Sequence, residues 1–345
     1  MQKLFVPIIA LALVAGAVSC KKEKVEHICT PVYQEGVYHP CQMIDTLVDE
    51  DGNRQIWLWS DNDLTEVRYG DDEVVTYNYA NNLISSVTTI GGAREEIHYS
   101  YEGGRFSTCD IYYNGAKALS MALNHNEAGK ISGADVTIEN DFLLQLAGSL
   151  LGKGTAFEKI VGNNMAKSLV DMAKMTQNQE GAKFDIGDKN VTMTLLWNGE
   201  NMTQQVNSAS INLNVSADDI EFISQFIDIP EQYMSMIQLV MAMGGGNVPL
   251  QLSVNDTMTS TYDNKNNPLF CNWGEIFSPQ NLSMNNVVTT TERGAMSVGI
   301  SMMGQTTNIY NQPIESYKEY IYEYNDKNYP TRVSGDLNVT YSYKK

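Results

Sequence analysis

The sequence is poor in the residues that most enzymes and nucleic-acid-binding proteins use. Its 345 residues include four His and five Cys, and 23 Lys and Arg stand against 41 Asp and Glu, so the formal net charge is −18. A chain this acidic repels a phosphate backbone, and we expect no nucleic-acid partner. Beyond the N-terminus, no apolar run reaches the length of about 18 residues that a membrane-spanning helix needs.

Catalytic and metal-binding motifs are also missing. The sequence contains no Gly-x-Ser-x-Gly, His-Glu-x-x-His, P-loop or dinucleotide-binding fingerprint. The acidic turn at 49–51 lacks the ligand spacing of a calcium loop. The four His are too scattered for a metal site: His27, His39, His98 and His125. We therefore predict no catalytic residue, no metal and no cofactor, and we expect that the protein is not an enzyme.

The first 19 residues are typical of a lipoprotein signal peptide. Lys3 gives a positive start, and an apolar run from Leu4 to Ala17 follows, which is too short for a permanent spanning helix. The small residues before Cys20 resemble the lipobox of bacterial lipoproteins. That resemblance implies a lipid on the Cys20 thiol, with palmitate among its acyl chains, as a membrane anchor. The alternative is an ordinary signal peptide cut near Ser19, next to an incidental Cys.

The residues after Cys20 bear on location. They read Lys21-Lys-Glu-Lys24. In lipoproteins of this kind an Asp directly after the Cys often signals inner-membrane retention, so its absence indicates the outer membrane. The acidic cluster of surface-exported Bacteroidetes lipoproteins is also missing, which leaves the periplasmic and cell-surface faces both open. We assign residues 20–44 to the lipid anchor and its tether.

Four further Cys follow the anchor, and an exported chain can oxidise them. They are Cys29, Cys41, Cys109 and Cys271. Four Cys allow three pairings. The most local pair, Cys29 and Cys41, is the candidate disulfide, and a loop this short would stabilise the chain by roughly 3 kcal/mol. Free buried thiols are the alternative.

Pairs of large side chains two positions apart recur in the first third of the chain. Trp57-Leu-Trp59, Tyr77-Asn-Tyr79, Tyr99-Ser-Tyr101 and the weaker Leu123-Asn-His125 are each followed by a polar turn and a new apolar stretch. Residues two apart lie on one face of a strand. The pattern predicts a tandem of β-hairpins over 45–139 that share one core face.

The same pattern returns near the C-terminus at Tyr322-Glu-Tyr324, within closing strands that we place at 246–345. Like elements at both ends suggest that the sheet curls until its ends meet. Between them, apolar residues at helical spacing indicate helical insertions at 140–180 and 217–245, and Asn198-Gly199 is typical of a hairpin turn. We predict one mainly β domain over 45–345. It is a strongly curved antiparallel meander or a soluble barrel, with helices filling or plugging its concave side.

Several stretches resemble a family of Bacteroidetes lipoproteins of unknown function with a porin-like fold, and distantly resemble YD-repeat hairpins. The resemblance rests on Cys20 after its apolar leader, on "YDNKNNPLF" at 262–270, on "LSMNNVV" at 282–288 and on "YEYNDKNYPTRV" at 322–333. It implies a fold and a lineage and no particular reaction.

Two short motifs suggest modification. Asp45-Thr46-Leu47 and Asp256-Thr257-Met258 resemble the acceptor used for O-glycosylation of exported Bacteroidetes proteins. They make Thr46 and Thr257 candidate glycosylation sites.

The function expected from these features is a lipid-anchored envelope protein with a non-catalytic binding or interaction role. Its partner would be an unknown protein or glycan. An alternative is a carrier that holds an apolar ligand inside the barrel, since most of the Met residues lie in the second half of the chain. A polysaccharide-acting enzyme is a remote alternative.

Overall fold

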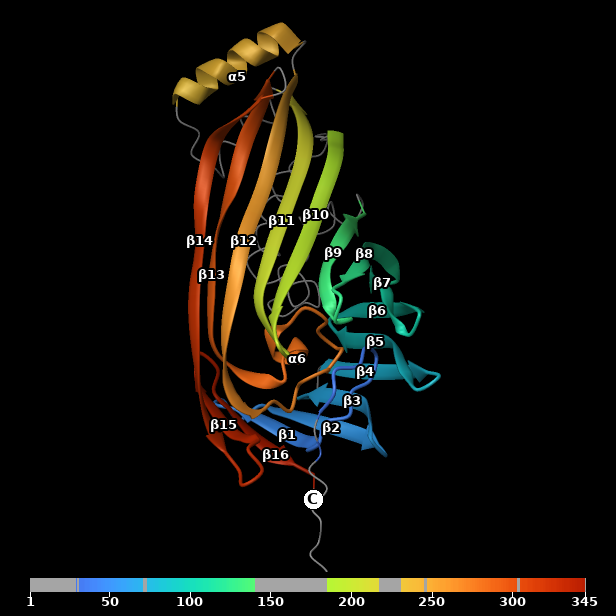
Figure 1. Cartoon of the computed structure of the whole chain (residues 1–345). Coiled ribbons are helices and arrows are strands. Elements are labelled where there is room, and N and C mark those ends of the chain that lie inside the picture. Colours follow the sequence, from blue (N-terminus) through green and yellow to red (C-terminus); the bar gives the residue numbers. More distant parts are fainter. Residues whose placement is uncertain are drawn as a thin grey trace, which may run out of the picture. The chain divides into compact units, whose positions relative to one another are not determined.

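The computed structural model describes Cys29 and residues 31–70, 73–139, 185–216, 231–244, 247–302 and 305–344 (Figure 1). Residues 31–345 form one compact unit, and residues 1–30 form a second. The leader, Cys20 and the helical insertion predicted at 140–180 lie outside the described residues. Of the second predicted insertion, 217–245, the structure describes a helix over its last part.

Sixteen antiparallel strands in the described part of the chain close into a barrel in sequential order. The shorter strands are β1 (Ile44–Asp49), β2 (Arg54–Ser60), β3 (Asp63–Tyr69), β4 (Glu73–Ala80), β5 (Leu83–Gly91), β6 (Ala93–Glu102), β7 (Arg105–Tyr113), β8 (Ala116–His125), β9 (Ile131–Ile138), β15 (Pro330–Gly335) and β16 (Val339–Tyr343). The longer strands are β10 (Asp185–Asn198), β11 (Asn201–Ser216), β12 (Asn247–Asn266), β13 (Asn285–Met302) and β14 (Gln305–Tyr324). The described helices are α5 (Glu231–Gly244) and α6 (Pro279–Leu282). No helix among the described residues is both long and apolar enough to cross a membrane.

The hairpins predicted from the paired side chains are confirmed. β2 pairs with β3, β4 with β5, β6 with β7 and β8 with β9. In the β4–β5 turn, Asn81 and Asn82 have φ values of 53° and 64°, a left-handed conformation that Asn tolerates better than most residues. The hairpin predicted around Asn198-Gly199 is β10–β11.

The two ends of the sheet meet, as the repeated pattern predicts. β1 pairs with β16, with Leu47 opposite Tyr341 and Val48 opposite Thr340. Of the two predicted alternatives, an open meander and a barrel, the chain therefore adopts the barrel. Closure joins the first and last strands, whose edges would otherwise be free to pair with other chains.

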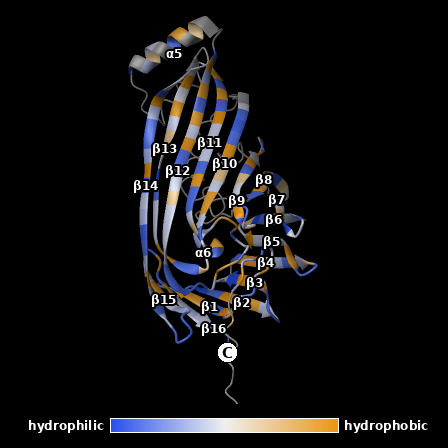
Figure 2. Cartoon of the chain, in the orientation of Figure 1, coloured by the Kyte–Doolittle hydropathy of each residue, from blue (hydrophilic) through white to orange (hydrophobic). Residues whose placement is uncertain are grey.

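Along the first part of β12, the inward-facing side chains are apolar and the outward-facing side chains are polar. Along β12, Val248, Leu250, Leu252 and Val254 are buried. The intervening positions Gln251, Ser253 and Asn255 are half-buried or exposed, and Figure 2 shows this alternation along the long strands. A barrel that faces lipid has the reverse order, apolar outside and polar inside. The outer face of β12 therefore suits water.

A loop between β12 and β13, residues 267–284, lies inside the barrel, and we call it the plug. Tyr77 of β4 donates a hydrogen bond to Asn272 Oδ1 at 3.3 Å, and the Met202 backbone N–H of β11 donates to Ser283 Oγ at 3.0 Å. Strands from distant parts of a closed barrel can contact one loop only if it is inside. The buried apolar side chains of the plug are Phe270, Cys271, Trp273, Ile276, Phe277 and Leu282.

The sequence predicts a helical filling, and most of it falls on residues 140–180 and 217–230, outside the described residues. The described residues inside the barrel form the plug, a loop with one short helix, α6. Each large apolar side chain that the plug buries contributes about 1.5–3 kcal/mol, which favours this loop inside the barrel over solvent. The described helix α5 contacts β12 and buries Ile237.

The N-terminal segment 31–43 also belongs to the barrel unit, although the sequence predicts a tether over 20–44. Glu35 in this segment is 4% exposed. Its carboxyl group accepts a hydrogen bond from the Phe106 backbone N–H at 2.6 Å and lies 3.0 Å from His125 Nε2. These contacts fix the segment against β7 and β8, so the folded unit includes residues that precede the first strand.

Candidate functional site

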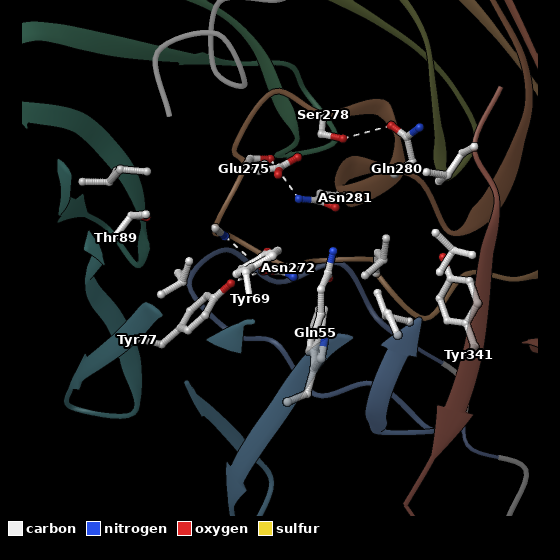
Figure 3. Close-up of a pocket in the computed structure, with 18 of the residues that line it drawn as sticks. Gln55, Tyr69, Tyr77, Thr89, Asn272, Glu275, Ser278, Gln280, Asn281 and Tyr341 are labelled. Atoms are coloured by element: carbon white, nitrogen blue, oxygen red, sulfur yellow. Dashed lines mark hydrogen bonds between the residues drawn. The ribbon is translucent and has the colours of Figure 1, made fainter. Parts of the chain in front are cut away.

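A cavity of about 480 Å³ lies between the plug and the inner wall formed by β1–β6 and β16 (Figure 3). The strand residues reach it because alternate side chains point inward. Its aromatic wall consists of Trp57, Tyr69, Tyr77 and Tyr341. Burial raises the pKa of Tyr341 to about 12, and burial with the nearby Glu275 charge raises the pKa of Tyr69 further. Both phenols therefore remain protonated hydrogen-bond donors at neutral pH.

The plug supplies the polar side of this cavity. Asn272, Glu275, Gln280 and Asn281 line it, and the wall adds Gln55, Thr89 and Glu95. Internal hydrogen bonds hold the plug groups in place (Figure 3). Asn281 Nδ2 donates to the Glu275 backbone carbonyl at 3.2 Å, and Ser278 Oγ donates to Gln280 Oε1 at 3.0 Å. The cavity thus sets flat aromatic faces against amide and carboxylate groups.

A second cavity, of about 240 Å³, lies on the β11–β14 side of the plug. It shares Glu275, Ser278 and Gln280 with the first cavity, so these plug residues form a common wall. The strand side chains in it are mostly polar: Gln205, Asn207, Asp256, Thr290, Glu292, Ser316 and Lys318. Polar side chains thus replace the apolar inward series of β12 from Asp256 onward.

Hydrogen bonds link these polar side chains across strands. Gln205 Nε2 donates to Asn207 Oδ1 at 2.9 Å, and Asn207 Nδ2 donates to Asp256 Oδ2 at 3.1 Å. Burial and the neighbouring Glu292 carboxyl raise the pKa of Asp256 to about 7. Gly294 on β13 lies opposite Asp256. A Cβ atom at position 294 would come within 2.5 Å of the Asp256 Cα. The absence of a side chain at Gly294 therefore leaves space for Asp256.

The residues predicted as lipidation, disulfide and glycosylation sites line neither cavity or lie outside the described part. Cys20 is not described. Cys29 and Cys41 are each disulfide-bonded, and Cys109 and Cys271 are free and buried.

The two candidate acceptor threonines lie on strands. Thr46, on β1, and Thr257, on β12, are half-buried. In the second motif, Thr257 follows Asp256, whose side chain points into the barrel.

No group of three or more His, Cys, Asp or Glu side chains suited to a metal ion occurs among the described residues. Trp57 and Tyr77 of the aromatic wall were predicted, because paired aromatics were expected on the inner face of the sheet, whereas Tyr69 and Tyr341 were not. The polar groups of the plug and the buried acid Asp256 were missed. The plug could have been identified from its sequence, because an apolar loop connects two strands there. Asp256 could have been identified because it lies among the inward-facing positions of β12.

Comparison with known proteins identifies no family for the chain. No family model matches the chain, and no curated protein matches it. Among solved structures, a porin-like protein from Bacteroides vulgatus is similar over 88% of this chain and 99% of that chain, with 9% identity and a TM-score of 0.33. A TarM mutant from S. aureus, in complex with fondaparinux, alpha-GlcNAc-glycerol and UDP, is similar over 31% of this chain and 24% of that chain, with 11% identity and a TM-score of 0.17. The functional argument therefore depends on the cavities themselves.

Proposed function

We propose that the protein is a lipid-anchored, non-catalytic protein of the cell envelope that binds a small hydroxyl-rich ligand inside its barrel. The lipid on Cys20 would hold it at the outer membrane. The signal-peptide pattern before Cys20 supports the anchor. The polar outer face of β12 supports a barrel that stands in water beside the membrane.

The observation that carries the binding role is the two-sided lining of the 480 Å³ cavity. Ligand pockets are commonly about 300–1,000 Å³ and combine apolar walls with a few polar groups that fix orientation. A sugar ring has an apolar face that packs on an aromatic side chain and a hydroxyl edge that needs hydrogen-bond partners. Trp57 and Tyr77 provide the first surface, and Gln280 and Asn272 provide the second.

A purely apolar ligand fits this lining less well. No Met is among the described residues that line the 480 Å³ cavity, whereas Glu95 and Glu275 are. An apolar molecule would remove these carboxyl groups from water without giving them hydrogen bonds, which is costly. The lining therefore favours a ligand with hydroxyl groups over a lipid.

The test is calorimetric titration of the mature protein, carrying Cys20→Ser, against a panel of neutral mono- and oligosaccharides. We expect Gln280→Ala and Trp57→Phe to weaken the binding of the selected sugar by about tenfold or more, since each removes a contact to a buried ligand. The control is Tyr317→Ala, because Tyr317 is 59% exposed on β14 and its loss should leave binding unchanged.

Three results would count against the proposal. Failure of every sugar to bind, or equal binding by Gln280→Ala and the unmodified protein, would reject a hydroxyl-rich ligand at this site. A lipid found in native mass spectra would favour the apolar carrier instead. Release of new reducing ends, lost in Glu275→Gln, would replace the non-catalytic role by hydrolysis.

A further inference from the structure

The 240 Å³ cavity has an acidic character that the proposed sugar site does not require. Three carboxyl groups line it, from Asp256, Glu275 and Glu292. Lys318 is the one cationic side chain among its described lining residues. A cavity with this excess of negative charge favours a positively charged occupant.

Its inner wall also has a buried hydrogen-bond acceptor without a donor. Gln205 is 2% exposed, and its Oε1 atom has no hydrogen-bond partner in the described protein. Leaving such an atom unsatisfied costs about 1–3 kcal/mol. An amide oxygen can only accept a hydrogen bond, so the missing group is a donor.

Two of the carboxyl groups lie together. Asp256 and Glu292 are on neighbouring strands, with Glu292 opposite Met258, and their carboxyl groups interact through a hydrogen bond. Burial, together with the neighbouring Glu292 carboxyl, raises the pKa of Asp256. Ser316 Oγ donates to Glu292 Oε2 at 3.2 Å and fixes the orientation of that carboxyl.

The chemistry of the remaining lining distinguishes an organic cation from a metal ion. Phe277 and Tyr320 line the same cavity, and aromatic rings attract ammonium groups through their faces. They are not ligands for hard metal ions, which prefer a shell of six or more oxygens. The described residues also lack a metal-binding group of three acidic, His or Cys side chains.

We propose that the 240 Å³ cavity binds an organic ammonium group, which donates hydrogen bonds to Asp256 and Glu292 and lies against Phe277 and Tyr320. This inference does not depend on the proposed sugar ligand, because the ammonium site is built by β11–β14 and the other face of the plug. Failure of either proposal would leave the other intact.

The experiment is calorimetric titration of the mature protein, carrying Cys20→Ser, with putrescine and with butanediol, its neutral analogue of equal length. We expect binding of putrescine only, weakened by about tenfold or more in Asp256→Asn and Glu292→Gln, because each removes one charged hydrogen bond. Lys318→Met should strengthen binding by about threefold or more, since it removes a competing cation. Glu315→Gln is the matched control: it removes one negative charge next to Ser316, from an exposed side chain.

Opposite effects of the two kinds of substitution exclude a simple loss of folding. A misfolded variant would not bind more tightly, as Lys318→Met is expected to do. The proposal is overturned if putrescine does not bind, if butanediol binds equally well, or if Asp256→Asn and Glu292→Gln retain the unmodified affinity. Equal losses in Glu315→Gln and Asp256→Asn would also overturn it, because they would show a general effect of net charge.

Discussion

The buried acid Asp256 predicts how the stability of the barrel depends on pH. Its pKa rises from 3.8 to about 7 on folding, because burial and the neighbouring Glu292 disfavour its charged form. Between these values the native state holds a proton that the unfolded chain has released. The free energy of unfolding should therefore fall as the pH rises from about 4 to about 7, and the contribution is lost above that.

The size of this effect follows from the shift. One pKa unit corresponds to about 1.4 kcal/mol, so a rise of about three units amounts to about 4 kcal/mol. This is an upper bound, because Glu292 shares the interaction, Glu275 adds to the negative charge of the cavity, and Lys318 opposes it. In Asp256→Asn this contribution disappears, while an oxygen that can accept the Asn207 hydrogen bond remains.

The assay is urea denaturation of both proteins at about pH 5 and about pH 8, without added amine. We expect Asp256→Asn to gain up to about 3 kcal/mol over the unmodified protein between these conditions, because only the two pKa units between about pH 5 and about pH 7 are sampled. Comparison at each pH removes the contributions of all other titrating groups. The reasoning is wrong if the difference between the two proteins is the same at both pH values, or if the same gain occurs in Glu315→Gln.

Three further predictions concern other parts of the barrel. Glu35→Ala should lower the free energy of unfolding by about 1–3 kcal/mol, because it leaves the buried backbone N–H of Phe106 without an acceptor; an unchanged free energy in urea denaturation would contradict this. Gly36→Ala should lower the thermal midpoint of unfolding. Gly36 has a φ of 75°, and a Cβ atom there would overlap the phenol oxygen of Tyr101. An unchanged midpoint would argue against this strain. Burial raises the pKa of Cys271 to about 12 and raises that of Cys109 further. Both thiols should therefore resist iodoacetamide at neutral pH until the chain is unfolded with urea. Rapid labelling of the native protein would refute their burial.

The hairpins and the closure could be predicted because they depend on local periodicity. Paired side chains such as Tyr77 and Tyr79 identify one face of a strand, and the Asn-rich turns between strands favour the conformations that hairpins need. Like patterns at the two ends then indicated where the sheet would close. None of this requires knowledge of contacts between distant residues, apart from the closure itself.

The plug could not be predicted from the same reasoning. Residues 267–284 have no regular period, and the hydrogen bond that fixes Asn272 comes from Tyr77, which is 195 positions away. The density of apolar residues around Phe270 and Trp273 was a signal that this loop is too apolar for a surface turn. The cavities lie between the plug and the wall, so the functional site was missed together with the plug.

The seam of the barrel also constrains how the chain folds. Ser342 of β16 donates a hydrogen bond to the backbone carbonyl of Thr46 in β1, and these residues are 296 positions apart. Such distant pairing is slow, because the entropy of a very long loop is lost before the contact forms. During synthesis, the edge of β1 must therefore wait for β16, which lies almost 300 positions later in the chain. The yield of folded protein should consequently depend on protection of the early hairpins from aggregation, rather than on the stability of any one hairpin.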